Sequence, residues 1–198
     1  MIEKLLIFLT RLLTGAIAQS RGFSFDPPTQ RIYYANHSSH MDTLVIWSLI
    51  PKAQRHKVRP AAAKDYWWSS SWKKYLAEHV FNAISVERLP EHGCNPLQSL
   101  DDALTQGDSL IFFPEGTRGS GTKIQPFKNG LYHLVAKHPH ITLVPVYIDN
   151  LNRVLPKGEL LPVPIICTVT FGAGFTIKPD ESKTDFISRA HTELEMLA

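Results

Sequence analysis

The stretch RIYYANHSSHMD, residues 31–42, is the most informative part of the chain, because an apolar, β-prone run passes directly into a polar segment that holds a histidine and a carboxylate. A helix advances about 100° per residue, so a uniform helix would point positions five apart in different directions. A strand over residues 31–35, followed by a helix over residues 39–49, instead places His37 on the turn and Asp42 in the first helical turn. The two side chains can then meet.

A carboxylate beside a histidine fixes the tautomer and orientation of the imidazole and leaves its other nitrogen free to take a proton from a hydroxyl. This pattern makes His37 a candidate general base and Asp42 its orienting partner. Two other interpretations stay open. Ser39-x-x-Asp42 resembles a helix capping box, and His37, His40 and Asp42 are all side-chain types that bind zinc. The remaining histidines are scattered without ligand spacing.

A second segment, FPEGTR at residues 113–118, has the same layout. The apolar run over residues 109–113 has the length and composition of a strand covered on both faces, and it ends in a turn that carries Arg118. Arginine presents a planar fork of donors that suits an anion. The alternative is a flexible Gly/Ser-rich surface loop whose arginine simply stays solvated.

Together, the two segments resemble the glycerolipid acyltransferases of the 1-acylglycerol-3-phosphate acyltransferase family, whose first signature is N-H-x4-D and whose third is F-P-E-G-T-R. Both signatures are complete here and stand in the family's order. The second signature is similar to residues 84–88, although Asn82 or Ala83 replaces its usual glycine. Residues 126–130 are similar to the family's F-K-x-G element and residues 143–148 to its fourth, proline-containing strand.

The resemblance implies a role for each matching residue. His37 would be the general base that deprotonates the acceptor hydroxyl, and Asp42 would orient it. The acceptor's phosphate would bind at Glu115, Gly116, Thr117 and Arg118, with Arg88 and Lys128 adding positive charge. Within this set we expect Glu115 to position Arg118 or the acceptor glycerol.

The implied reaction moves a fatty acyl group from acyl-CoA or acyl carrier protein to the free hydroxyl of a lysophospholipid, 1-acylglycerol 3-phosphate, giving phosphatidic acid. We expect no covalent acyl-enzyme, because there is no G-x-S-x-G elbow and neither cysteine has a neighbouring base. We also expect no metal or redox cofactor. The alternatives are another lysolipid or glycolipid acceptor, a metal-dependent hydrolase using His37, His40 and Asp42, and a non-catalytic membrane-binding module.

Length and composition indicate one globular domain, since the 198 residues are 43% hydrophobic and 20% charged. The net charge of +3 is not gathered into a block long enough to predict nucleic-acid binding. Cys94 and Cys167 have no paired spacing, so a disulfide framework and a zinc ribbon are not indicated, and a reducing compartment fits best.

The N-terminal segment is an amphipathic helix in this interpretation, with a broad apolar face over residues 1–17. Its unbroken apolar run, residues 5–9, is far shorter than the about 20 residues that span a bilayer, and Arg11 interrupts the apolar region of a signal peptide. We expect residues 1–20 to lie on the cytoplasmic face of a membrane, monotopic or peripheral, and residues 21–198 to form the acyltransferase domain. Basic residues beside tryptophans over residues 52–75 suit the same surface. The alternative for both segments is packing within the protein, and the basic and aromatic run could also stack on single-stranded nucleic acid.

Strands and helices alternate along the chain, which predicts a single-domain α/β fold with helices on both faces of the sheet. A return hairpin near the C-terminus predicts a mixed, mostly parallel sheet, and the resemblance implies a glycerol-3-phosphate acyltransferase-like fold. In such sheets, ligands bind at the strand ends, where His37 and Glu115 both lie. Expected strands cover residues 22–25, 32–35, 57–63, 81–86, 109–113, 142–148, 162–171 and 174–177. Expected helices cover residues 1–19, 39–49, 64–79, 96–105, 131–137 and 184–197.

Overall fold

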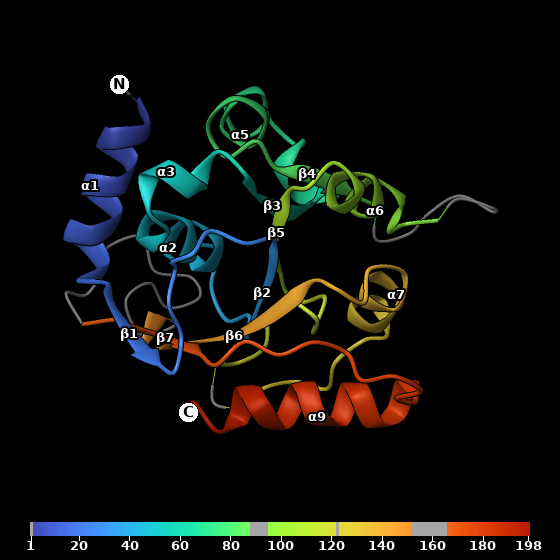
Figure 1. Ribbon diagram of the computed structural model, residues 1–198. Coiled ribbons are helices and arrows are strands. Elements are labelled where there is room, and N and C mark those ends of the chain that lie inside the picture. Colours follow the sequence, from blue (N-terminus) through green and yellow to red (C-terminus); the bar gives the residue numbers. More distant parts are fainter. Residues whose placement is uncertain (1, 88–94, 122, 152–165) are drawn as a thin grey trace.

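A seven-stranded sheet forms the centre of the protein, in a computed structural model that describes residues 2–87, 95–121, 123–151 and 166–198 (Figure 1). Its strand order is β1-β7-β6-β2-β5-β3-β4, and β6 and β7 are antiparallel whereas the other neighbouring pairs are parallel. The predicted mixed, mostly parallel sheet is therefore confirmed. The strands are β1 (Ile17–Arg21), β2 (Arg31–Ala35), β3 (Val58–Ala63), β4 (Ile84–Val86), β5 (Ser109–Phe112), β6 (Thr142–Asp149) and β7 (Thr168–Gly172).

Helices cover both faces of this sheet, as predicted. Figure 1 shows α7 and α9 on one side of the strands and α1 and α2 on the other. The described helices are α1 (Ile2–Thr14), α2 (Asp42–Leu49), α3 (Lys52–Arg55), α4 (Lys64–Trp67), α5 (Ser71–Tyr75), the π-helix η1 (Leu76–Val80), α6 (Gln98–Thr105), α7 (Gly130–Lys137) and α9 (Lys183–Glu195).

The central strand β2 shows how the two cores are divided. All five of its residues are buried. Ile32 and Tyr34 pack into the core shared with α6, α7 and α9, whereas Tyr33 and Ala35 pack into the core shared with α2. Alternate residues of a strand point to opposite faces, so a strand covered on both faces is apolar at every position. This burial fixes the register of β2 and hence the position of the residues that follow it.

The N-terminal expectations were wrong beyond residue 14. Helix α1 ends at Thr14, where Gly15 adopts φ 55, a left-handed conformation that glycine reaches without steric cost. The chain then forms the edge strand β1 over Ile17–Arg21, and residues 22–25 are not a strand. Pairing with β7, about 150 residues away in sequence, creates β1, and a local pattern cannot show a contact of that range.

Several further boundaries differ from the prediction. The expected helix over residues 64–79 is divided into α4, α5 and η1, the expected strand over residues 81–86 begins at Ile84, and the expected helix over residues 96–105 begins at Gln98. Helix α2 begins at Asp42 rather than at residue 39, because residues 39–41 form a turn. Residues 174–177 make only one isolated bridge, between Leu143 and Phe175, instead of a strand. The expected strand over residues 162–171 is observed from Thr168, and its residues 162–165 lie outside the described residues.

The strand order brings the two signature segments together. Strands β2 and β5 are parallel neighbours, with Tyr34 paired to Phe112, so their carboxyl ends meet at one edge of the sheet. His37 follows the first of these ends and Glu115 the second. The two segments are therefore adjacent, as the sequence predicts for a ligand site at the strand ends.

Candidate active site

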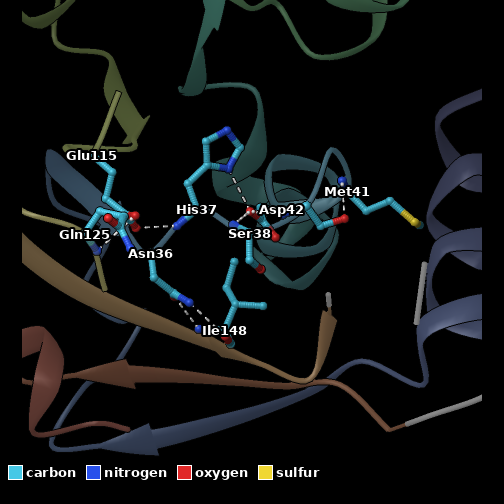
Figure 2. A network of polar contacts seen from close by, with 9 residues as sticks. Asn36, His37, Ser38, Met41, Asp42, Glu115, Gln125 and Ile148 are labelled. Atoms are coloured by element: carbon cyan, nitrogen blue, oxygen red, sulfur yellow. Dashed lines mark hydrogen bonds and ion pairs between the residues drawn. The ribbon is translucent and has the colours of Figure 1, made fainter. Parts of the chain in front are cut away.

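Asp42 organises the turn between β2 and α2. Its side chain is fully buried, and its Oδ2 lies 2.7 Å from Nδ1 of His37. The same oxygen accepts hydrogen bonds from the backbone N–H groups of Ser38 at 2.7 Å and Ser39 at 2.9 Å (Figure 2). The predicted contact between the histidine and the carboxylate is therefore present. The capping interpretation also has a basis, because the same carboxylate at the start of α2 binds the preceding backbone.

The ring of His37 is held in one orientation. It stacks on the ring of Phe113, with centroids 4.3 Å apart and planes 23° apart. Because a carboxylate only accepts hydrogen bonds, the contact with Asp42 favours the tautomer that carries its proton on Nδ1. That tautomer leaves the lone pair of Nε2 free. His37 lines a pocket at the carboxyl ends of the strands, which is described below, so its ring can act on a molecule bound there.

Glu115 lies behind His37 and holds its backbone. One carboxylate oxygen accepts the N–H of His37 at 2.7 Å, and the other accepts the N–H of Gln125 at 3.1 Å. The N–H of Gly119 donates to the carbonyl of His37 at 2.8 Å. Glu115 is 4% exposed, and this burial raises its pKa, although the two backbone donors act in the opposite direction. Through these hydrogen bonds, Glu115 of the FPEGTR segment holds His37 of the first signature.

Asn36 holds the end of β2 through a contact that the sequence analysis missed. Its side-chain amide donates to the carbonyl of Ile148 at 2.9 Å and accepts the N–H of Ile148 at 2.8 Å (Figure 2). The last paired residues of the β2–β6 ladder are Ala35 and Val146, so the amide continues the pairing beyond the strand. An asparagine directly after a buried strand was the available signal, since its amide has the donor and acceptor of a peptide group.

A pocket of ≈ 600 Å³ opens at this edge of the sheet. Of the predicted site residues, His37, Gly116, Arg118 and Lys128 line it. Thr117 lies on the exposed loop beside them. Arg88 was also predicted to bind substrate, and it lies outside the described residues.

The side chain of Lys128 lies directly against Gly116. Gly116 has φ +72, and a Cβ built on it would lie 2.9 Å from Nζ of Lys128. The backbone N–H of Lys128 donates to the carbonyl of Pro114 at 2.8 Å. A side chain at position 116 would therefore be strained and would displace the lysine. The glycine of the signature allows the ammonium group to lie against the loop.

The cationic side chains of Arg118 and Lys128 line the pocket. Across the described part of the chain, neither the guanidinium of Arg118 nor the ammonium of Lys128 makes a hydrogen bond or salt bridge. Unpaired cations that face a pocket favour an anionic ligand. The apolar part of the wall comes from Ala61, Ala63, Val86, Leu97, Phe112 and Phe113.

The zinc-binding interpretation requires that His37, His40 and Asp42 converge on one point. The described residues contain no group of three or more histidine, cysteine, aspartate or glutamate side chains placed to hold a metal ion. His40 instead stacks on Tyr66, with ring centroids 4.4 Å apart. His37 directs one nitrogen at Asp42. These three side chains therefore do not form a metal site in this arrangement.

The fold and the site define a class of α/β protein in which an oriented imidazole and a loop that carries an arginine line one pocket. A family model described as Acyltransferase matches residues 25–149, more than half of the chain. The chain therefore belongs to this acyltransferase family, which includes 1-acyl-sn-glycerol-3-phosphate acyltransferases.

Relatives and one solved structure agree with this family. The chain is similar to 1-acyl-sn-glycerol-3-phosphate acyltransferase alpha of Mus musculus (28% identity, 80% of this chain, 54% of the relative). It is also similar to 1-acyl-sn-glycerol-3-phosphate acyltransferase of Limnanthes alba (31% identity, 71% of this chain, 48% of the relative). It thus spans about half the length of these curated relatives. The crystal structure of the 1-acyl-sn-glycerophosphate (LPA) acyltransferase PlsC from Thermotoga maritima has the same fold (TM-score 0.75, 18% identity, 99% of this chain, 78% of that chain).

Cys167 should be unreactive in the folded protein. Its thiol is fully buried, and burial raises its pKa to about 12, with further contributions from the negative charges of Asp42 and Asp149. The thiol is therefore protonated at neutral pH and is a poor nucleophile. In a Cys94→Ala variant, we expect a thiol reagent such as DTNB to modify Cys167 only after denaturant is added. Rapid modification of the native variant would contradict this description of the site.

Proposed function

We propose that this protein transfers a fatty acyl group from an acyl thioester to the free hydroxyl of 1-acylglycerol 3-phosphate, giving phosphatidic acid. The observation that carries the proposal is the contact of 2.7 Å between His37 and Asp42 at a pocket where Arg118 and Lys128 are unpaired. The names of the relatives support the same reaction. Acyl-CoA and acyl carrier protein both remain donors in this proposal.

His37 acts as the general base in the proposed reaction. Its Nε2 takes the proton of the acceptor hydroxyl as the hydroxyl oxygen forms a bond to the thioester carbonyl carbon. Asp42 stabilises the imidazolium that forms. The tetrahedral oxyanion is stabilised by backbone N–H groups or by a nearby cation. The C–S bond then breaks, and the leaving thiolate takes the proton from His37.

The two substrates meet different parts of the pocket. The acceptor's phosphate binds Arg118 and Lys128, because charge-assisted hydrogen bonds to phosphate are stronger than neutral ones. The loop at Gly116 and Thr117 approaches the same headgroup. The apolar wall, which includes Val86 and Leu97, suits a hydrocarbon chain. This mechanism uses neither a metal nor a covalent acyl-enzyme.

Helix α1 provides a surface for binding to the cytoplasmic face of a membrane in this proposal. One side of it packs on the protein: Leu6 and Ile7 contact the core, and Arg11 donates to the carbonyl of Ser48 at 2.7 Å. Its other side exposes Ile2, Leu5, Phe8, Leu9, Leu12 and Leu13. An apolar face on an anchored amphipathic helix suits the lipid interface. None of the described helices is long and apolar enough to cross a membrane.

Replacement of His37 by alanine should lower the rate of acyl transfer by about 10²- to 10⁴-fold, because the general base is lost. Asp42→Asn should lower it by at least about 100-fold, because an amide does not select the required tautomer. The measurement is thioester consumption with lysophosphatidic acid present. His56→Ala is the matched control, since it removes an exposed imidazole outside the pocket. Near-wild-type turnover in both test variants would eliminate the mechanism.

Arg118→Ala should raise the KM for lysophosphatidic acid by about 10-fold or more, because one charged contact with phosphate is lost. The KM for monoacylglycerol, which has no phosphate, should change little. Steady-state kinetics with the two acceptors and one donor test this expectation. Equal changes for both acceptors would argue against a phosphate role for Arg118.

A Phe8→Glu, Leu12→Glu double variant should bind vesicles of anionic phospholipid at least about 10-fold more weakly, because charge on the exposed face opposes insertion. Its turnover of short-chain, water-soluble substrates should be unchanged. Met196→Glu is the control, since Met196 is exposed on another helix end. Vesicle sedimentation measures the binding. Equal binding by the wild type and the double variant would show that α1 does not bind the membrane.

A further inference from the structure

Three side chains beside the pocket form a stack that the proposed reaction does not use. The ring of His40 stacks on Tyr66, with centroids 4.4 Å apart and planes 19° apart. The Nζ of Lys73 lies 4.1 Å from the centroid of the same tyrosine ring. His40 and Tyr66 both line the pocket that contains His37 and Arg118. We call His40, Tyr66 and Lys73 the His40–Lys73 stack.

The positive charge of Lys73 is not balanced by an acidic partner. Its Nζ lies 3.4 Å from the hydroxyl of Ser69 and over aromatic rings, and across the described residues it makes no salt bridge. The adjacent Lys74 is different, because it pairs with Glu78 at 4.0 Å. Lys64, at the start of α4, pairs with Glu87. Among the described residues, Lys73 is therefore a cation without an acidic partner, like Arg118, and it lies against the pocket residue Tyr66.

His40 is the group on which these charges act. Its pKa lies below the usual value because packing removes part of its water and because Arg118, His37 and Lys73 disfavour a further positive charge, whereas Asp42 acts weakly in the opposite direction. The neutral ring is therefore the main form in the free protein at pH 7. An anion placed among these groups would reverse the balance and favour the protonated ring.

Two of the carboxylates near the stack are engaged with other groups. Asp42 directs Oδ2 at His37 and the turn, and Glu87 is paired with Lys64. Asp65 also lines the pocket, on α4 beside Tyr66. A guanidinium, an ammonium and a protonatable imidazole together match the several oxygens and the negative charge of a phosphate group better than those of a single carboxylate.

We propose that the His40–Lys73 stack is a second anion site, which works with Arg118 to bind a phosphate group of one of the two substrates. This inference rests on the proposed function for the identity of the substrates. Two sources share the chemistry: the headgroup phosphate of the lysolipid and the phosphate of the donor's phosphopantetheine arm. His40 occupies one of the x positions of the first signature, and Lys73 lies outside both signature segments, so the site would distinguish this chain's substrate binding from that of the loop alone.

A direct binding test uses the pH titration of the His40 ring, followed by NMR. The probes are glycerol 3-phosphate and 4′-phosphopantetheine, each added to the wild-type protein. We expect one of them to raise the pKa of His40, and the same probe to have a smaller effect on Lys73→Met. Lys74→Met is the matched control and should respond like the wild type. If neither probe moves the titration of His40 in the wild type, or if the two lysine variants respond alike, the second site does not exist.

Kinetics identify the source of the phosphate. With one donor, Lys73→Met should raise the KM for lysophosphatidic acid about three- to tenfold more than the KM for monoacylglycerol if the site takes the acceptor. With one acceptor, it should raise the KM for acyl-CoA by a similar factor over that for an acyl-N-acetylcysteamine thioester if the site takes the donor. No selective effect in either pair would overturn the proposal. Absence of any acyl transfer by the wild type would instead refute the proposed function, and the NMR titration would still decide the anion site.

Discussion

A single buried oxygen, Oδ2 of Asp42, holds the turn on which the rest of the site depends. It contacts Nδ1 of His37 and accepts the N–H groups of Ser38 and Ser39. Hydrogen bonds to a carboxylate are stronger than neutral ones, and this carboxylate is fully buried. One side chain therefore shapes the loop, starts helix α2 and orients the imidazole. The same oxygen of Asp42 therefore has a structural role in the turn and, in the proposed mechanism, a chemical role toward His37.

The sheet supplies the rigidity that this turn requires. Strand β2 is buried on both faces, and the amide of Asn36 extends its pairing with β6 by one more residue. Glu115, which follows the neighbouring strand β5, accepts the backbone N–H of His37. His37 is thus fixed through its ring, its N–H and its carbonyl. In the proposed mechanism, a general base held in this way would lose little entropy when a substrate binds.

The sequence predicted the features that depend on local pattern. The buried strands β2 and β5, the turn after each, and the meeting of His37 with Asp42 follow from apolar runs and from one spacing. The features it did not predict depend on partners distant in the chain. Strand β1 exists only because β7 lies beside it, and the contacts of Asn36 with Ile148 and of Glu115 with Gln125 need the folded loops. The stack of His40 on Tyr66 belongs to the same group.

The tautomer of His37 is the most direct test of the account, because the proposed chemistry requires an unprotonated Nε2 toward the pocket and a proton on Nδ1 toward Asp42. Nitrogen-15 NMR of histidine-labelled protein measures this state at a pH where the ring is neutral. The proposed mechanism requires a protonated Nδ1 and an unprotonated Nε2 in the wild type. A wild-type ring with its proton on Nε2 would contradict it, since that nitrogen could not then accept the proton of a hydroxyl.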